Sequence, residues 1–101
     1  MNKYHARKTW STLIGRQFDS KLEATRAEQL HLLQMAGEIK NLQYQVPIRL
    51  SDRVKAIIDF SYEQDGETIY EDAKGMLAAH SRVKYEWIKD KYGIEIKLWR
   101  G

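Results

Sequence analysis

Two periodicities of apolar and polar residues divide this chain into six expected elements. Apolar side chains recur at helical spacing in two segments, and they alternate with polar ones, as in half-buried strands, in four others. Asp19 or Ser20 can cap the first helix, Gly37 is a natural helix stop, and Pro47 favours either an edge strand or a bulge. In order, we expect a helix over 19–36, strands over 39–50, 54–62 and 68–74, a helix over 78–91 and a strand over 94–99.

The second and third expected strands are joined at Asp65-Gly66, a pair typical of a two-residue type I′ hairpin. With these two residues at the centre of the turn, Asp59 lies opposite Asp72. Like charges at directly opposed positions repel, and Lys74 follows two residues later on the same face of the strand. The same register pairs Gln64 with Glu67 and Tyr62 with Ile69.

The order of the elements predicts an α/β fold. The strand over 68–74, the helix over 78–91 and the strand over 94–99 form a β-α-β unit, whose two strands run parallel in most proteins. Together with the antiparallel hairpin this gives a mixed sheet flanked by helices. On the second helix we expect the apolar stripe of Ala79, Val83 and Trp87, flanked by Ile88, to face the sheet.

Composition limits the classes of protein to consider. With 101 residues the chain is long enough for one domain, and its lack of cysteine excludes disulfides and thiolate chemistry. There is no apolar run long enough to cross a membrane and no secretory signal pattern, so we expect a cytoplasmic protein without a membrane partner. The 17 basic and 14 acidic residues leave a net charge of +3, which by itself is weak support for nucleic-acid binding.

The distribution of charge is more informative than its total. Residues 1–18 contain no acidic residue, and Tyr4 and Trp10 lie among the bases. We therefore divide the single domain, 1–101, into a basic N-terminal arm over 1–17 and a core over 18–101. Such an arm suits a phosphate backbone, and a solvated tail is the equally favoured alternative. Its basic residues are Lys3, Arg7, Lys8 and Arg16.

Two opposed acids beside a lysine form a candidate divalent-metal site. Mg²⁺ prefers oxygen ligands, takes one or two carboxylates and keeps several waters, so Asp59 and Asp72 suit it, with the carbonyl of Ala73 as a further ligand. Glu23 can join them from the first helix, unless its carboxylate instead completes a capping box with Ser20. The alternative is a set of solvated strand residues and a surface ion pair of little energetic value.

The residues at this site resemble the signature of the PD-(D/E)XK nuclease superfamily. That signature is an acid on the second strand and an acid-x-Lys on the third, matched here by Ile58-Asp59 and by Asp72-Ala73-Lys74. Isoleucine replaces the proline of the family name, and Glu23 matches an acid that is frequent in the first helix. The resemblance implies a restriction-endonuclease-like core. Stretches between residues 18 and 96 are also similar to a family of small phage-encoded proteins.

What the resemblance implies is a nuclease dependent on Mg²⁺, for which Mn²⁺ can substitute. Glu23, Asp59, Asp72 and Lys74 would be catalytic, and phage relatives that resolve Holliday junctions suggest branched DNA as the substrate. Since symmetric cleavage of a junction takes two active sites, we expect a homodimer. Another nuclease specificity (nicking, flap or restriction-like) and a non-catalytic DNA-binding adaptor remain open. On the second helix, Lys84 and Lys91 are candidate phosphate contacts, or simply a solvated face.

Overall fold

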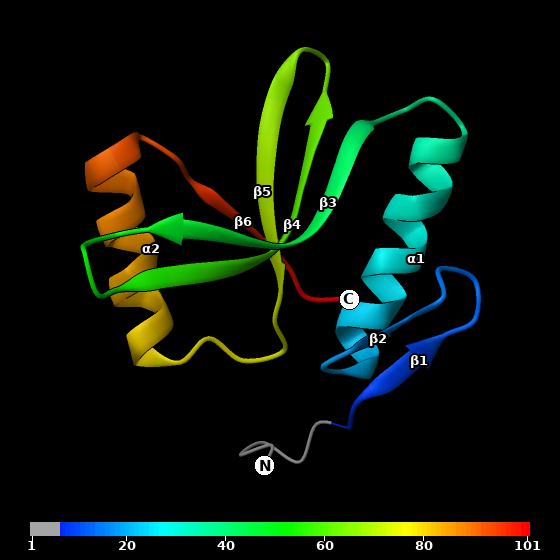
Figure 1. Cartoon of the computed structure of the whole chain (residues 1–101), viewed down its shortest axis with the longest axis horizontal. Coiled ribbons are helices and arrows are strands. Elements are labelled where there is room, and N and C mark those ends of the chain that lie inside the picture. The colour runs from blue at the N-terminus through cyan, green and yellow to red at the C-terminus, as the bar shows by residue number, and fades with distance from the viewer. Residues whose placement is uncertain (1–6) are drawn as a thin grey trace.

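The computed structural model describes residues 7–101, which form a mixed four-stranded sheet with two helices and a small separate hairpin (Figure 1). The N-terminal hairpin consists of β1 (Thr9–Ser11) and β2 (Arg16–Phe18). The elements of the core are α1 (Lys21–Met35), β3 (Lys40–Arg49), β4 (Lys55–Gln64), β5 (Glu67–Ala73), α2 (Ala79–Tyr92) and β6 (Ile96–Trp99). From α1 onward this is the predicted order, so the α/β prediction is confirmed.

The sheet has the strand order β3-β4-β5-β6. The first three strands are antiparallel neighbours, whereas β6 runs parallel to β5, as the β-α-β unit requires. Pro47 lies in β3, at an edge of the sheet, where its missing N–H removes no bond from a central ladder.

The tight turn between β4 and β5 sets their register. Asp65 and Gly66 have φ angles of 52° and 81°, as a type I′ turn requires at both central positions. The pairs Gln64–Glu67 and Tyr62–Ile69 form as predicted, and the ladder continues to Phe60–Glu71. Asp59 and Asp72 come directly after this last pair, so the turn carries them to the same level of the sheet.

The β3–β4 ribbon bends beside Asp59, and the two parts of the ribbon pack into two separate hydrophobic cores. Beyond the bend, Phe60 and Tyr62 pack with α1 and the N-terminal hairpin, while on the other side Ile58 packs with Ile88 of α2. Figure 1 shows the two helices at opposite sides of the molecule, with the strands crossing between them. The bend therefore places Asp59 between the two helices.

The basic arm predicted over 1–17 requires correction. Residues 9–18 fold into the β1–β2 hairpin, which packs on α1. Ser11 is buried and donates a 2.6 Å hydrogen bond to Glu28, and Phe18 enters the core beside α1. The first part of the predicted arm, including Lys3, lies outside the described residues.

The predicted packing face of α2 is also wrong. Ala79 is exposed, and the side chains of Val83 and Trp87 are 62% and 39% exposed. The helix packs instead through Ile88, which flanks the predicted stripe, and through Tyr85, because these side chains fit the apolar surface of the bent ribbon. Within residues 7–101, neither helix has the length and apolar character needed to cross a membrane.

Candidate active-site cleft

Asp59 and Asp72 join β4 to β5 where the backbone ladder ends. The N–H of Asp59 donates to Oδ1 of Asp72 at 2.7 Å, and the N–H of Ala73 donates to Oδ2 of Asp59 at 2.9 Å. Each carboxylate thus takes the place of a backbone carbonyl in the interstrand pairing. The exchange leaves Oδ1 of Asp59 without a protein donor among the described residues.

Glu23 approaches the two aspartates from the first turn of α1. Ser20 caps this helix, since its hydroxyl accepts a 3.1 Å hydrogen bond from the N–H of Glu23. The carboxylate of Glu23 is only 4% exposed, and its Oε2 accepts a 2.9 Å bond from Nε2 of Gln45 on β3. The bond to Gln45 therefore directs Glu23 toward the sheet.

A cleft of about 660 Å³ opens between the start of α1 and the start of α2. Glu23, Asp59, Ala73 and Lys74 all line it, so four of the five residues predicted for catalysis or metal binding share one cavity. Asp72 is not on its wall: this side chain is 2% exposed and lies behind Asp59. The remaining lining residues are Arg7, Asp19, Ser20, Lys21, Leu22, Gly75, Met76, Ala78, His80 and Ser81.

Burial and the repulsion between neighbouring carboxylates raise the pKa values of Glu23 and Asp59. Burial, followed by the charge of Asp19 and then that of Asp72, raises the pKa of Glu23 from 4.5 to about 7. Burial, followed by the charges of Asp72 and Glu23, raises the pKa of Asp59 from 3.8 to about 8. The N–H of Ala73 and the ammonium of Lys74 oppose this rise in the pKa of Asp59. A cation placed between the carboxylates would relieve the same repulsion.

The donor set fits a hydrated Mg²⁺ rather than a metal enclosed by protein ligands. Across residues 7–101, no three or more His, Cys, Asp or Glu side chains are gathered closely enough to hold a metal ion by themselves. Asp59 presents one free oxygen to the cleft, and Glu23 has one oxygen that Gln45 does not occupy. One or two carboxylates plus waters suffice for Mg²⁺, so these residues meet its minimum need.

Comparison with known proteins gives a family but no characterised relative. A family model described as "Protein of unknown function (DUF1064)" matches residues 1–100. The chain belongs to the DUF1064 family. No curated protein and no solved structure matches it.

Two residues of the DUF1064 site were missed by the sequence analysis. Gln45 has a left-handed backbone with a φ of 55°, and this conformation brings its side chain to Glu23 although the alternation along β3 predicts an outward position. Tyr85 of α2 donates its hydroxyl to Oδ2 of Asp72. Burial, followed by that bond, raises the pKa of Tyr85. A glutamine at an odd position of a strand and a tyrosine in a helix are too common to indicate a site.

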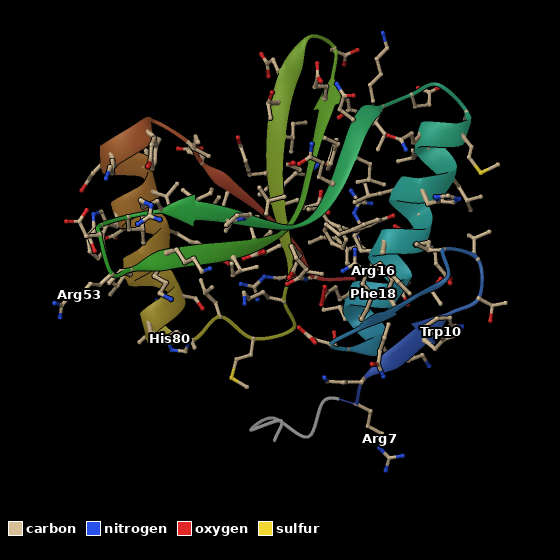
Figure 2. All side chains as sticks on the ribbon, viewed as in Figure 1. Arg7, Trp10, Arg16, Phe18, Arg53 and His80 are labelled. Carbon is tan, nitrogen blue, oxygen red and sulfur yellow. The ribbon has the colours of Figure 1, made fainter. Side chains whose placement is uncertain are left out.

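The predicted phosphate contacts of the DUF1064 chain are scattered in the structure. Arg7 and Lys8 are exposed and Arg7 lines the cleft, whereas Arg16 stacks on Tyr44 with its guanidinium 4.9 Å from the ring centre. Lys91 donates a 3.0 Å hydrogen bond to the carbonyl of Leu50, so its ammonium is engaged within the fold. Lys84 is half-buried on α2. Figure 2 shows Arg7 at the lower edge of the view and Arg16 close to α1.

Glu71 lies on the opposite face of β5 from the cleft, as the alternation along this strand predicts. Its fully buried carboxylate accepts bonds from Arg26 at 2.6 and 3.0 Å and from the hydroxyl of Tyr62 at 2.7 Å. Neighbouring acids of β5 therefore have different partners. Glu71 is neutralised by an arginine inside the core, whereas Asp72 supports the cleft.

Proposed function

We propose that this DUF1064 chain is a Mg²⁺-dependent endodeoxyribonuclease of the PD-(D/E)XK superfamily that hydrolyses phosphodiester bonds in branched DNA. The observation that carries the proposal is the meeting of Glu23, Asp59 and Lys74 in one cleft. Two carboxylates with raised pKa values and a lysine would be an unfavourable combination for stability alone. For binding a cation and a phosphate it is a suitable one.

Glu23 and Asp59 would hold the ion, with Asp72 behind them. When bound, Mg²⁺ would polarise a phosphate oxygen and lower the pKa of a coordinated water. Asp72 keeps the backbone of Asp59 in place through the 2.7 Å bond, and Gln45 orients Glu23. Lys74 would donate hydrogen bonds to the phosphate as negative charge builds up on its oxygens. The burial of Glu23 and the partial burial of Asp59 limit the water that competes for these contacts.

The substrate and the assembly are finer parts of the proposal. Branched DNA, with Holliday junctions as the leading example, is suggested by the resemblance to small phage proteins. A homodimer follows from the need for two cuts related by two-fold symmetry. Mn²⁺ should replace Mg²⁺, because both ions accept oxygen ligands in octahedral geometry.

A cleavage assay on matched substrates tests the proposal. A four-way junction, a flap and a linear duplex of shared sequence are incubated with the protein in Mg²⁺ or in EDTA. We expect Mg²⁺-dependent cleavage of the junction, and a loss of at least about 100-fold in Lys74→Ala and in Asp59→Asn. Asparagine retains the oxygen that accepts the Ala73 N–H bond, so Asp59→Asn should stay folded.

Lys40→Ala is the matched control, since Lys40 is an exposed residue on β3 that does not line the cleft. This variant should cleave as the native protein does. Undiminished, metal-dependent cleavage by highly purified Asp59→Asn would refute the assignment. If the native protein cleaves the flap or the duplex faster than the junction, the proposed specificity for Holliday junctions is wrong and another nuclease specificity takes its place.

One observation favours a second candidate, a non-catalytic DNA-binding adaptor. Both oxygens of Asp72 already accept hydrogen bonds, one from the N–H of Asp59 and one from the hydroxyl of Tyr85. An adaptor would use these bonds only to hold the strands together. It predicts DNA binding that is unchanged by EDTA, with no cleavage of any of the three substrates.

A further inference from the structure

The N-terminus of α2 opens into the cleft without a cap. Ala78 stands at the cap position and provides no side-chain hydrogen bond, and the first turn contains no acidic residue. The N–H groups of Ser81 and Arg82 bond to the carbonyl of Ala78, but those of Ala79 and His80 have no backbone acceptor among residues 7–101. The positive end of a helix with 14 residues is thus left uncompensated at the cleft.

Ser81 supplies an independent sign of a ligand. Its side chain is 9% exposed and lines the cleft, and its hydroxyl has no hydrogen-bond partner within the part of the chain that the structure describes. Among those same residues, every fully enclosed side-chain nitrogen or oxygen has a partner. The Ser81 oxygen must therefore be reached from the cleft. Because this hydroxyl opens onto the cleft and has no partner among the described residues, it is available to donate to a group that binds there.

The charges around the cleft define the kind of group that fits. Asp19, Glu23 and Asp59 lie toward α1 and β4, and would attract a cation. The uncapped helix end, with His80 and Ser81 beside it, provides N–H and O–H donors instead, and Lys74 lines the same cavity. Backbone N–H groups at a helix N-terminus bind phosphate readily. Cation and anion sites would then share one cleft, as a phosphodiester bound through a metal requires.

We propose that the first turn of α2 is a phosphate subsite, in which the N–H groups of Ala79 and His80, the His80 imidazole and the Ser81 hydroxyl donate to the oxygens of one phosphate. The identity of the phosphate as part of a nucleic acid rests on the proposed function. The donors themselves do not, because they bind through charge and hydrogen bonds whether or not cleavage follows. Figure 2 shows His80 at the start of α2.

A titration with inorganic phosphate in EDTA tests the subsite directly. In ¹⁵N-edited NMR spectra of the whole chain, we expect saturable shifts of the Ala79, His80 and Ser81 amides. His80→Asp should weaken phosphate binding at least about 10-fold, because it places a negative charge in the subsite. The same substitution should leave thermal stability equal or higher, since an acid in the first turn favours a helix. If His80 had only a structural role, His80→Asp would not weaken phosphate binding while leaving thermal stability unchanged or higher.

Ser81→Ala and Thr25→Ala form a matched pair of hydroxyl deletions in helices. Thr25 is exposed on α1 and does not line the cleft, so its loss should leave phosphate binding unchanged. Ser81→Ala should weaken binding about 3- to 10-fold, the equivalent of about one hydrogen bond. The inference is overturned if no saturable shift appears at α2, or if both His80→Asp and Ser81→Ala bind phosphate as the native protein does.

A second arm, with DNA, separates this inference from the nuclease proposal. If the native protein cleaves the four-way junction but His80→Asp shows the same KM, the phosphate subsite is wrong and the nuclease stands. If phosphate shifts the α2 amides but no substrate is cleaved, the nuclease proposal fails and the subsite stands. A raised KM for the junction in His80→Asp identifies the bound group as a DNA phosphate rather than free phosphate.

Discussion

Replacing Glu23 by glutamine should stabilise this protein at neutral pH in the absence of metal. Glu23 is 4% exposed, and burial together with the charges of Asp19 and Asp72 raises its pKa to about 7. Glutamine is neutral, has the same shape and can still accept the bond that Gln45 now donates. The substitution therefore removes the charge while preserving the contact.

The magnitude follows from the linkage between proton binding and folding. A carboxyl whose folded pKa is raised contributes full stability below its unfolded pKa of about 4.5, and loses it as the pH rises through the folded pKa of about 7. At about 1.4 kcal/mol per pKa unit, the ionised carboxylate destabilises the folded state by roughly 3 kcal/mol at pH 8. Glu23→Gln should therefore gain roughly 3 kcal/mol at pH 8 and almost nothing at pH 4.

Urea unfolding at pH 4, 6 and 8 in EDTA measures this gap. The slope of unfolding free energy against urea should match between the two proteins, since the exposed surface does not change. Glu38→Gln is the control, because Glu38 is exposed in the loop after α1 and its replacement should change stability equally at each pH. Carbon-detected NMR titration should also show a lower pKa for Asp59 in Glu23→Gln, because the charge of Glu23 contributes to its rise.

An equal gap between Glu23→Gln and the native protein at pH 4 and pH 8 would refute this reasoning. So would a gap that grows as the pH falls. Either result would mean that folding does not raise the pKa of Glu23. The electrostatic argument for a cation in the cleft would then fail.

Three further experiments test other parts of the structure. Mg²⁺ should raise the melting temperature of the native protein more at pH 8 than at pH 5, because at pH 5 protons compete with the ion for the carboxylates. In thermal scans Asp59→Asn should largely lose this response to Mg²⁺. An equal rise in melting temperature in both proteins would contradict the metal site. Arg26→Met should destabilise the fold by about 3–5 kcal/mol in urea unfolding, because it removes the closest cation from the buried Glu71 carboxylate and leaves Lys97, 3.9 Å away, and the Tyr62 hydroxyl. A loss below about 1 kcal/mol would show that these two remaining partners, or a proton, neutralise Glu71 at little cost. Gly66→Ala should cost about 1 kcal/mol by the same measurement, since alanine disfavours a φ of 81°, and the loss should vanish in Gly66→Asn, which tolerates this conformation.

Local signals were sufficient for much of the fold and for the central part of the site. Asp65-Gly66 determines a turn whose backbone twist sets the register, so the positions of Asp59 and Asp72 could be counted outward from it. Asp19 and Ser20 marked the start of α1, because either side chain can satisfy an N–H group that has no helical partner, and in the structure Ser20 does so. These features depend on residues only a few positions apart.

Other features depended on which surfaces meet in space. The apolar stripe of Val83 and Trp87 predicted the wrong face of α2, since a helix with apolar residues on two sides can pack through either. The bent ribbon offered a better fit to Tyr85 and Ile88, and that choice brought the Tyr85 hydroxyl to Asp72. Periodicity records how apolar a face is, but not the shape of its partner.

The sequence by itself determined the order of the elements, the hairpin register and the pairing of two aspartates with a nearby lysine. Only the tertiary structure decided that Gln45 turns inward to Glu23, that Asp72 lies behind Asp59 and that the uncapped end of α2 faces the acids. The physical reason is the sequence separation over which each kind of interaction acts. Turn and cap energies act between neighbours along the chain, whereas burial, charge repulsion and the lining of a cleft depend on segments that are distant in sequence.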